Sequence, residues 1–418
     1  MNQATMVFKI QSIKAKEILD SKGQPTVEVV LKAGGKSFKA SVPSGVSQGD
    51  YEAVELRDGG ERQHGKGVLR AIENIQKIIA PVLIGSDVSE QKRIDDLMIE
   101  LDGAKNKSNL GANALLPVSM AVCRAGAAAN GLPLWSYLSK LFEKLAENRS
   151  LPIVPKPSVL LIEGGKHGLG KLAFQEFMVI PEGDFGQAFS VAKKIYAALK
   201  KILKSKYGRL GIKMGVEGGF CPPITSVEEA LEMIMMAIKQ AGADGRVNIA
   251  IDAAASHFFK DGHYEVDGKM FSQNELADFY DSLVEKYPII SLEDPFDQND
   301  IESWQDFSSK ALIVGDDLTT TNSERIKMAH EKNLCTAVII KPNQIGTVSE
   351  TLAAASLAKK FGWKIIVSHR AGETNDDFIA DLAVGIGADF IKSGAPSQKV
   401  RMTKYNRLIK IQGNIPCK

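Results

Sequence analysis

The chain has 418 residues, of which 44% are hydrophobic and 24% charged, and its formal net charge is +2. This length exceeds one ordinary hydrophobic core, so we expect a small domain and a large one, or a barrel with an extension. The composition is that of a globular protein, and the small net charge gives no support to nucleic-acid binding, which needs a concentrated basic stripe.

The cysteines indicate neither a zinc site nor a disulfide framework, because Cys123, Cys221, Cys335 and Cys417 are scattered without a CxxC pair. Reduced thiols of this kind are typical of a cytoplasmic protein. The first residues lack a basic segment followed by a long apolar core, so we expect no signal peptide. No uncharged apolar stretch approaches the roughly 18 residues of a membrane span.

The first 60 residues have the alternating pattern of β-strands. Three segments, "VFKIQSIKAKEIL", "TVEVVLKA" and "KSFKASV", are joined by the turn signals "DSKGQP" and "GG". From about residue 65 the apolar spacing becomes helical, as in "GVLRAIENIQKIIAPVL". Three strands followed by helices predict an α+β domain over residues 1–140.

Residues 141–418 follow a proline-rich connector, and there short apolar runs alternate with helical patterns. The runs are "RVNIAI", "YPIISL", "ALIVG", "CTAVII", "KIIVS" and "ADFI". Two of the helices begin with S-x-x-E, Ser226 to Glu229 and Ser272 to Glu275, the signature of a capping box. This alternation predicts a (β/α)8-type barrel, with an open doubly wound sheet as the alternative.

Each apolar run ends at a charged residue; in order these are Asp252, Glu293, Asp316, Lys341, the pair His369-Arg370, and Lys392. One charge after a strand is ordinarily the start of a solvated loop. Six in succession, with acids first and bases later, are hard to assign to loops alone. Because the carboxyl ends of parallel barrel strands meet at one rim, we expect these groups to form a single site there.

The chemistry of the six groups is coherent. Asp252, Glu293 and Asp316 are hard oxygen donors, which favour Mg²⁺ over zinc. Lys341 and Lys392 face them, and a divalent cation and a second lysine should lower a lysine pKa from its usual value of about 10.4. A lysine base opposite carboxylate-held Mg²⁺ suits removal of a proton next to a substrate carboxylate.

Long segments of the chain resemble the enolase (phosphopyruvate hydratase) family, in the family's order and spacing. They include "EILDSKGQPTVEVVL", "SVPSGVSQGDYEAVELRDG", "KLAFQEFMVIP", "SLEDPF", "GDDLTTTN", "IIKPNQIGT", "SHRAGET" and "IKSGAP". The resemblance covers essentially the whole chain. It implies an enolase-like modified TIM barrel and Mg²⁺-dependent dehydration of 2-phosphoglycerate to phosphoenolpyruvate in glycolysis and gluconeogenesis.

The resemblance also implies the metal ligands. Asp252, Glu293 and Asp316 would bind the first of two Mg²⁺ ions. Ser47, in the glycine-flanked "SGVSQG", would bind the second ion together with the substrate phosphate. The glycines on either side would allow that loop to move.

The remaining implied roles are catalytic and substrate-binding. Lys341 would take the C2 proton, and Lys392 would stabilise the enediolate and hold the substrate carboxylate. Glu217 would act as general acid on the departing hydroxyl, with support from Glu176. The groups around the substrate and its phosphate would be Arg370, Ala371, His167, His369 and Gln175.

The chain departs from the family pattern at several positions near these residues. Glu163 and Lys166 stand in "EGGKHGLGK", where the family usually has Asn and Ser, and Val216 replaces an acid before Glu217. Further departures are Gln48, Leu160, Leu169, Gly170, Pro342 and Ala371. No proposed ligand, base or acid is lost. A paralog acting on another 2-hydroxy acid, or a non-catalytic scaffold, stays open, as does the choice between a homodimer and an octamer.

Overall fold

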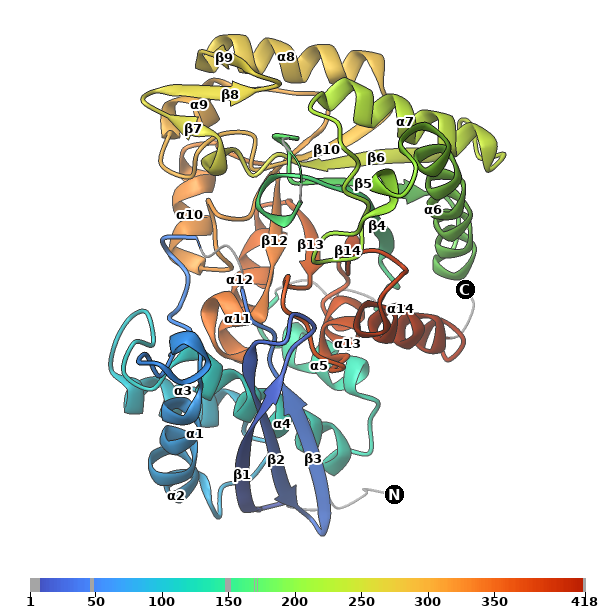
Figure 1. The fold of residues 1–418 in the computed structure, drawn as a ribbon. Coiled ribbons are helices and arrows are strands. Elements are labelled where there is room, and N and C mark those ends of the chain that lie inside the picture. Colours follow the sequence, from blue (N-terminus) through green and yellow to red (C-terminus); the bar gives the residue numbers. More distant parts are fainter. Residues whose placement is uncertain (1–7, 46–48, 147–151, 169, 171, 416–418) are drawn as a thin grey trace.

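The computed structural model describes residues 8–45, 49–146, 152–168, 170 and 172–415 (Figure 1). Its N-terminal part holds a three-stranded antiparallel sheet of β1 (Ile10–Leu19), β2 (Pro25–Ala33) and β3 (Lys36–Ser41). These are the three strands that the alternating segments predict. The helices that follow are η1 (Arg62–Gly65), α1 (Leu69–Asn74), η2 (Ile75–Ile79), α2 (Ala80–Leu83), α3 (Gln91–Asp102), α4 (Ala112–Ala129) and α5 (Leu134–Glu143).

Helix α4 forms the core of this part and packs on β2 and β3. It is rich in alanine, and a Cβ added to its Gly126 would lie 2.5 Å from the Tyr137 hydroxyl, so only glycine fits there. The helix is long and apolar enough to cross a membrane, but 83% of it is buried inside the protein. Such burial is typical of a core helix of a folded domain.

The C-terminal part is a closed barrel of eight strands, which confirms the predicted class and excludes the open sheet. The strands are β4 (Lys156–Glu163), β5 (Glu176–Pro181), β6 (Val247–Asp252), β10 (Ile289–Glu293), β11 (Leu312–Gly315), β12 (Ala337–Ile340), β13 (Lys364–Ser368) and β14 (Phe390–Lys392). All six apolar runs form strands as predicted. Strand β5 is antiparallel to both of its neighbours, whereas the other pairs are parallel. The sequence patterns indicate neither this reversal nor the barrel role of β4 and β5.

Helices surround the barrel and connect its strands (Figure 1). They are η3 (Gly165–His167), α6 (Phe185–Tyr207), η4 (Leu210–Ile212), α7 (Val227–Gln240), η5 (Ala255–His257), α8 (Gln273–Lys286), α9 (Ile301–Asp306), α10 (Ser323–Glu331), α11 (Pro342–Ile345), α12 (Val348–Lys360), α13 (Phe378–Gly385) and α14 (Lys399–Gln412). The long interval between β6 and β10 also holds a small sheet of β7 (Phe259–Lys260), β8 (His263–Val266) and β9 (Lys269–Phe271).

One of the two expected capping boxes is complete. The Ser272 hydroxyl accepts from the Glu275 N–H, and the Glu275 carboxylate accepts from the Ser272 N–H. Ser226 caps the N–H of Glu229 in the same way. The Glu229 carboxylate, however, pairs with Lys206 at 2.8 Å instead of reaching back. The predicted box at Ser226 is therefore half formed, because a cation on α6 attracts its glutamate.

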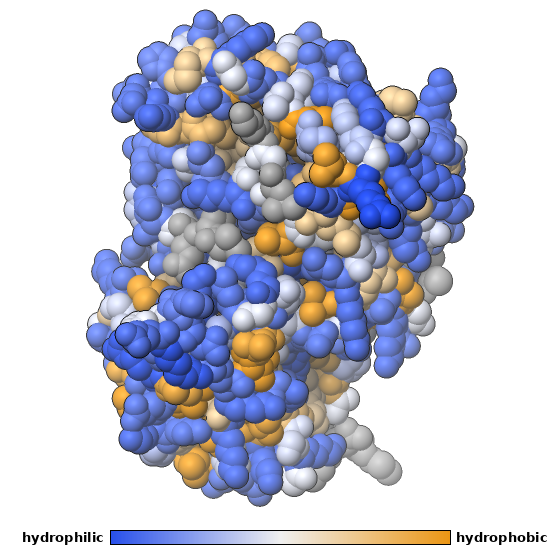
Figure 2. Space-filling model, viewed as in Figure 1, coloured by the Kyte–Doolittle hydropathy of each residue, from blue (hydrophilic) through white to orange (hydrophobic). Residues whose placement is uncertain are grey.

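The N-terminal part is tied to the barrel loop that follows β13. Arg124 on α4 donates to the Lys39 carbonyl of β3 and to both carboxylate oxygens of Asp376, at 3.0, 3.0 and 2.7 Å. The Ser41 N–H also donates to Asp376, at 3.0 Å. On the face in Figure 2 the surface is largely hydrophilic, with scattered apolar patches. The division into residues 1–140 and 141–418 stays our proposal; residue 140 lies in α5.

Candidate active site

The strand register places four carboxylates side by side at one rim of the barrel. Glu163 at the end of β4 pairs with Glu176 at the start of β5, and Glu176 pairs with Asp252 at the end of β6. Asp252 in turn pairs with Glu293 at the end of β10. Because β5 runs in the opposite direction, its first residue reaches the rim at which its neighbours end. A search limited to residues at the carboxyl ends of strands would miss Glu176.

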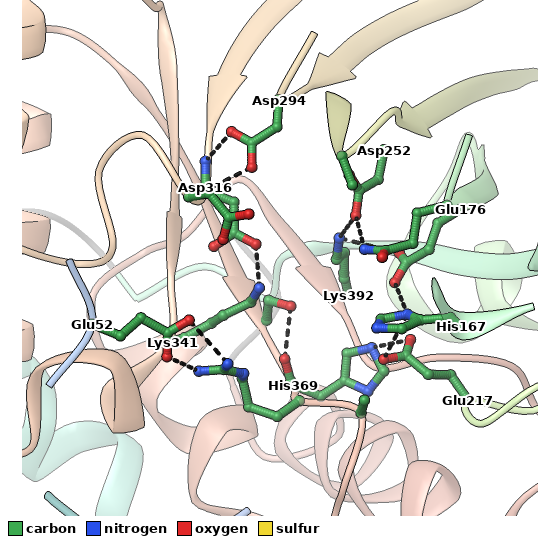
Figure 3. A pocket seen from close by; sticks show the side chains of 16 residues that line it. Glu52, His167, Glu176, Glu217, Asp252, Asp294, Asp316, Lys341, His369 and Lys392 are labelled. Atoms are coloured by element: carbon green, nitrogen blue, oxygen red, sulfur yellow. Dashed lines mark hydrogen bonds and ion pairs between the residues drawn. The ribbon is translucent and has the colours of Figure 1, made fainter. Parts of the chain in front are cut away.

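A pocket at this rim brings most of the predicted site residues together (Figure 3). Those that line it are His167, Gln175, Glu176, Glu217, Asp252, Asp316, Lys341, His369, Arg370, Ala371 and Lys392. Glu293 is not among the lining residues; it is buried beside the pocket against Lys392. Ser47 lies outside the described residues, so its assignment as a metal ligand stays a prediction.

Lys392 holds the carboxylate cluster together. Its Nζ lies 2.8 Å from both Glu293 oxygens, 3.3 Å from Asp252 Oδ2 and 3.1 Å from Glu176 Oε2. Burial acts to lower the pKa of Lys392, but these carboxylates outweigh it and raise the pKa well above its usual value. The ammonium group therefore stays charged and acts as an internal cation at the rim.

Lys341 is bound in the same way to Asp316, through a short ion pair. Burial lowers the Lys341 pKa, but the Asp316 carboxylate more than offsets this and the pKa is raised. The lowered pKa that we expect from the sequence concerns a lysine beside a divalent cation and stays a prediction, whereas here the shift has the opposite direction. The reason is that the nearest charge is an anion, which stabilises the protonated amine.

The acids of the predicted metal set differ in the direction of their pKa shifts. Burial raises the pKa of Asp252 and of Glu293, and neighbouring carboxylates add to the effect. Asp316 is buried as well, but Lys341 and Lys392 lower its pKa to about 2. Gln175 donates from Nε2 to Asp252 Oδ2 at 3.2 Å and so orients that carboxylate.

Two carboxylates beside the predicted set also belong to the site. Asp294 accepts from the backbone N–H groups of Asp316 and Asp317, at 2.9 and 2.8 Å. Ligand atoms of these three residues lie within 4.8 Å of one another. The set Asp252, Glu293 and Asp316 is not this compact within the described chain, because the two ammonium groups lie among its oxygens. Asp294 directly follows Glu293 in "SLEDPF". Two consecutive acids at the end of a predicted strand are the sequence feature from which Asp294 could have been predicted as a site residue.

A second cluster combines two histidines with two glutamates. His167 Nδ1 lies 3.7 Å from Glu176 Oε1 and 3.6 Å from Glu217 Oε1. His369 Nε2 lies 3.0 Å from Glu217 Oε2. Within the described part of the chain, neither ring nitrogen of His167 has a hydrogen-bond partner. Buried polar atoms of this kind need a partner, so the cluster is suited to receive a polar ligand.

The charges in this cluster determine where its protons reside. Burial would raise the pKa of Glu217, but His369 and His167 outweigh it and hold the pKa well below its usual range. Burial would lower the pKa of His167, but Glu217 and Glu176 raise it. Burial lowers the pKa of His369. These shifts favour the ionised form of Glu217 and the protonated form of His167 over that of His369.

Glu163 positions the loop that carries Glu217. Its carboxylate accepts from the N–H of Glu217 at 3.1 Å and from the N–H of Gly219 at 2.6 Å. A Cβ added to Gly215 would lie 2.2 Å from Glu163 Oε2, so glycine is required for this approach. Burial and the neighbouring Glu217 raise the pKa of Glu163 to about 9.

Arg370 and Ala371 line the remaining side of the pocket. The two Arg370 Nη atoms donate to the two carboxylate oxygens of Glu52, at 2.7 and 3.0 Å, and Nη1 also donates to Asn343 Oδ1 at 3.1 Å. Buried Arg401 donates to the carbonyl groups of Arg370 and Ala371, each at 2.6 Å. No motif pointed to Glu52 or Arg401, because their roles depend on contacts distant in sequence.

Comparisons of this chain with protein-family models and with curated proteins agree with the geometry of the site. The family model described as "Enolase, C-terminal TIM barrel domain" matches residues 151–417, and "Enolase, N-terminal domain" matches residues 10–138. A curated protein named "Enolase" from Methanothrix thermoacetophila is 46% identical over 412 residues, which cover 97% of this chain and 96% of the relative. Both domain models and the full-length relative name the same family. The chain therefore belongs to the enolase family of hydro-lyases.

Proposed function

We propose that the protein catalyses the reversible, Mg²⁺-dependent dehydration of 2-phosphoglycerate to phosphoenolpyruvate in glycolysis and gluconeogenesis. The observation that carries this proposal is the placement of a lysine and a glutamate on different sides of one pocket. Lys341 and Glu217 flank Lys392 there, as Figure 3 illustrates. Removal of a proton and loss of a hydroxyl from adjacent carbons need two such groups.

The donor set fits a divalent cation. Its carboxylates are hard oxygen ligands, and two ammonium groups already stand among them as internal cations. Asp252, Glu293 and Asp316 would hold the first Mg²⁺, with Gln175 orienting Asp252. Bound Mg²⁺ supplies charge neutralisation for the substrate carboxylate and the negative charge that develops on it. A second ion at Ser47 is part of the proposal.

Lys341 acts as the base for the C2 proton. It pairs with Asp316 in this structure, and this anion stabilises its protonated form. Engagement of Asp316 as a metal ligand would remove that stabilisation and lower the Lys341 pKa, so that the ammonium could release its proton to solvent and act as a neutral amine. Lys392 keeps its proton and stabilises the enediolate as a fixed positive charge.

The proton for the departing hydroxyl comes from the cluster of Glu217 and His167. Glu217 contacts the leaving group as the general acid, and His167, with its raised pKa, supplies the proton through it. Glu176 lies within 3.7 Å of the same imidazole and supports its charged form. His369 Nε2 lies beside the other carboxylate oxygen of Glu217, Oε2, and keeps that oxygen in polar surroundings.

The phosphate binds at Arg370, whose forked guanidinium suits two phosphate oxygens, and at the backbone of Ala371. The family resemblance also underlies two further parts of the proposal, a cytoplasmic location and assembly as a homodimer or octamer. The Ala371 departure leaves the phosphate without a side-chain hydroxyl, which motivates a comparison with other 2-hydroxy acids.

The direct test is the rise in ultraviolet absorbance as purified protein forms an enol phosphate from 2-phosphoglycerate. A rise that needs Mg²⁺ and stops on addition of EDTA is expected. Absence of a rise from folded, Mg²⁺-loaded protein would reject this substrate. Other 2-hydroxy acids would then be assayed in the same way, and failure of all of them would favour a scaffold.

A further inference from the structure

Glu52 is an anionic side chain of the N-terminal part that lies in the pocket of the barrel. Its carboxylate is nearly buried, with 6% of the side chain exposed, and it lines the pocket together with the barrel residues. Besides its two bonds from Arg370, it accepts from the N–H of Gly49 at 3.1 Å. Neither the motifs nor the family resemblance gave it a role.

The pair between Glu52 and Arg370 has the geometry of an anion site that is already filled. Two parallel N–H···O bonds of 2.7 and 3.0 Å join the guanidinium fork to a planar carboxylate (Figure 3). A phosphate group uses the same fork in the same bidentate way. Asn343 accepts a further bond from Nη1, so this fork edge offers little room for two anions.

Electrostatic repulsion adds to the competition between Glu52 and a bound phosphate. Glu52 and a phosphate dianion carry like charges, and in a buried site such repulsion is poorly screened. Arg370 itself is buried, and Glu52 is the largest of the charges that keep its pKa raised despite that burial. A ligand anion that binds both Nη atoms of the fork therefore has to displace the Glu52 carboxylate.

We propose that Glu52 is a specificity-determining residue that competes with the ligand phosphate for Arg370. The substrate identity rests on the proposed function, but the competition concerns any phosphate monoester or inorganic phosphate. A ligand gains binding energy from the fork only where its anion binds there better than the Glu52 carboxylate does. Glu52 therefore favours phosphorylated acids, with their dianionic group, over 2-hydroxy acids that carry a second carboxylate or no second anion.

The test is titration of inorganic phosphate into the full-length protein by calorimetry. Glu52→Gln should bind phosphate roughly tenfold more tightly than wild type, because a charged competitor becomes a neutral one. The KM of Glu52→Gln for 2-phosphoglycerate should also be lower than that of the wild type. Glu52→Asp keeps the charge but shortens the side chain, so it should give an intermediate gain and provides a second variant if Glu52→Gln does not fold.

Two controls separate competition from general charge removal. Glu55→Gln removes a buried carboxylate three residues along, which contacts Arg57 and the Gly45 N–H. It should tighten phosphate binding by less than about twofold. In an Arg370→Gln background, the gain from Glu52→Gln should disappear, as expected for coupled partners.

Unchanged or weaker phosphate binding by Glu52→Gln would overturn the proposal, as would an equal gain from Glu55→Gln or persistence of the gain without Arg370. Turnover of 2-phosphoglycerate by wild-type protein tests the proposed function separately. An inactive protein that nevertheless shows the Arg370-dependent gain would reject the function and retain the competition.

Discussion

The two sides of the pocket are built by different means. On the side formed by β6 and β10–β14, Asp252 and Lys392 are the last residues of their strands, and Lys341 directly follows its strand. On the side of the antiparallel strand β5, Glu176 begins its strand, and Glu217 lies on a loop held by the Glu163 carboxylate. Strand register positions Glu176 and the groups on the first side, whereas side-chain contacts to the backbone position Glu217.

Because of this difference, the two sides of the pocket should respond differently to substitutions. A group at a strand end keeps its place when its neighbours change, because the strand register holds its backbone. A group on a loop depends on each contact that holds the loop. We therefore expect substitutions on the parallel side to alter chemistry alone, and substitutions in or against the Glu217 loop to alter chemistry and position together.

The largest effect is expected for Lys341→Ala. Loss of the base should lower turnover of 2-phosphoglycerate by roughly a thousandfold, since general base catalysis contributes on this scale. Exchange of the substrate C2 proton with solvent deuterium, followed by NMR, should be lost equally. Lys364→Ala is the matched control, because exposed Lys364 begins β13 at the opposite end of the barrel and pairs with half-buried Asp389. Substantial residual turnover in Lys341→Ala would refute the assigned role.

Glu217→Gln should have a smaller and different effect. Turnover should fall by roughly a hundredfold, because the departing hydroxyl loses its acid. Exchange of the C2 proton should continue, since Lys341 is untouched. The same two assays thus separate the two sides of the pocket. Equal loss of exchange and turnover would mean that Glu217 also serves the proton-removal step.

The smallest effect on turnover, a few-fold loss, is expected for Glu163→Gln, which keeps one acceptor oxygen for the loop N–H groups. The informative readout is stability against pH, measured by urea unfolding. An ordinary glutamate pKa is about 4.3, and burial beside Glu217 raises that of Glu163 to about 9.

The protonated form of Glu163 is therefore favoured by folding. Its contribution to stability is complete below about pH 4.3 and is lost as the pH rises towards about 9. Wild type should thus lose stability relative to Glu163→Gln across this range. A difference in unfolding free energy that does not change with pH would show that the Glu163 pKa is not raised.

Predictability from sequence follows the same division. The six strands β6 and β10–β14 could be predicted, together with Asp252, Asp316 and Lys392, because each of these apolar runs ends at a charged residue on the rim. The antiparallel direction of β5 could not, since strand composition carries no information about direction. The raised lysine pKa values also escaped prediction, because they depend on which anion lies nearest in space.

Two departures from the family pattern meet in the structure. Val216 removes an acid before Glu217, and Glu163 introduces one where an amide is usual. The Glu163 carboxylate accepts from the Glu217 N–H, so the introduced acid lies beside the peptide unit from which the other is missing. Taken singly in the sequence they are unrelated changes, whereas in the fold they affect the same loop.

The contacts of Arg124 and Ser41 with Asp376 have a consequence for modularity. They anchor the loop after Arg370 to strand β3 and helix α4, so one wall of the barrel pocket depends on residues encoded far upstream. Glu52 adds a second upstream contribution inside the pocket itself. A gene fragment for the barrel alone would supply most of the chemical groups without the contacts that align this wall. An engineered version of the pocket therefore needs both parts of the chain together.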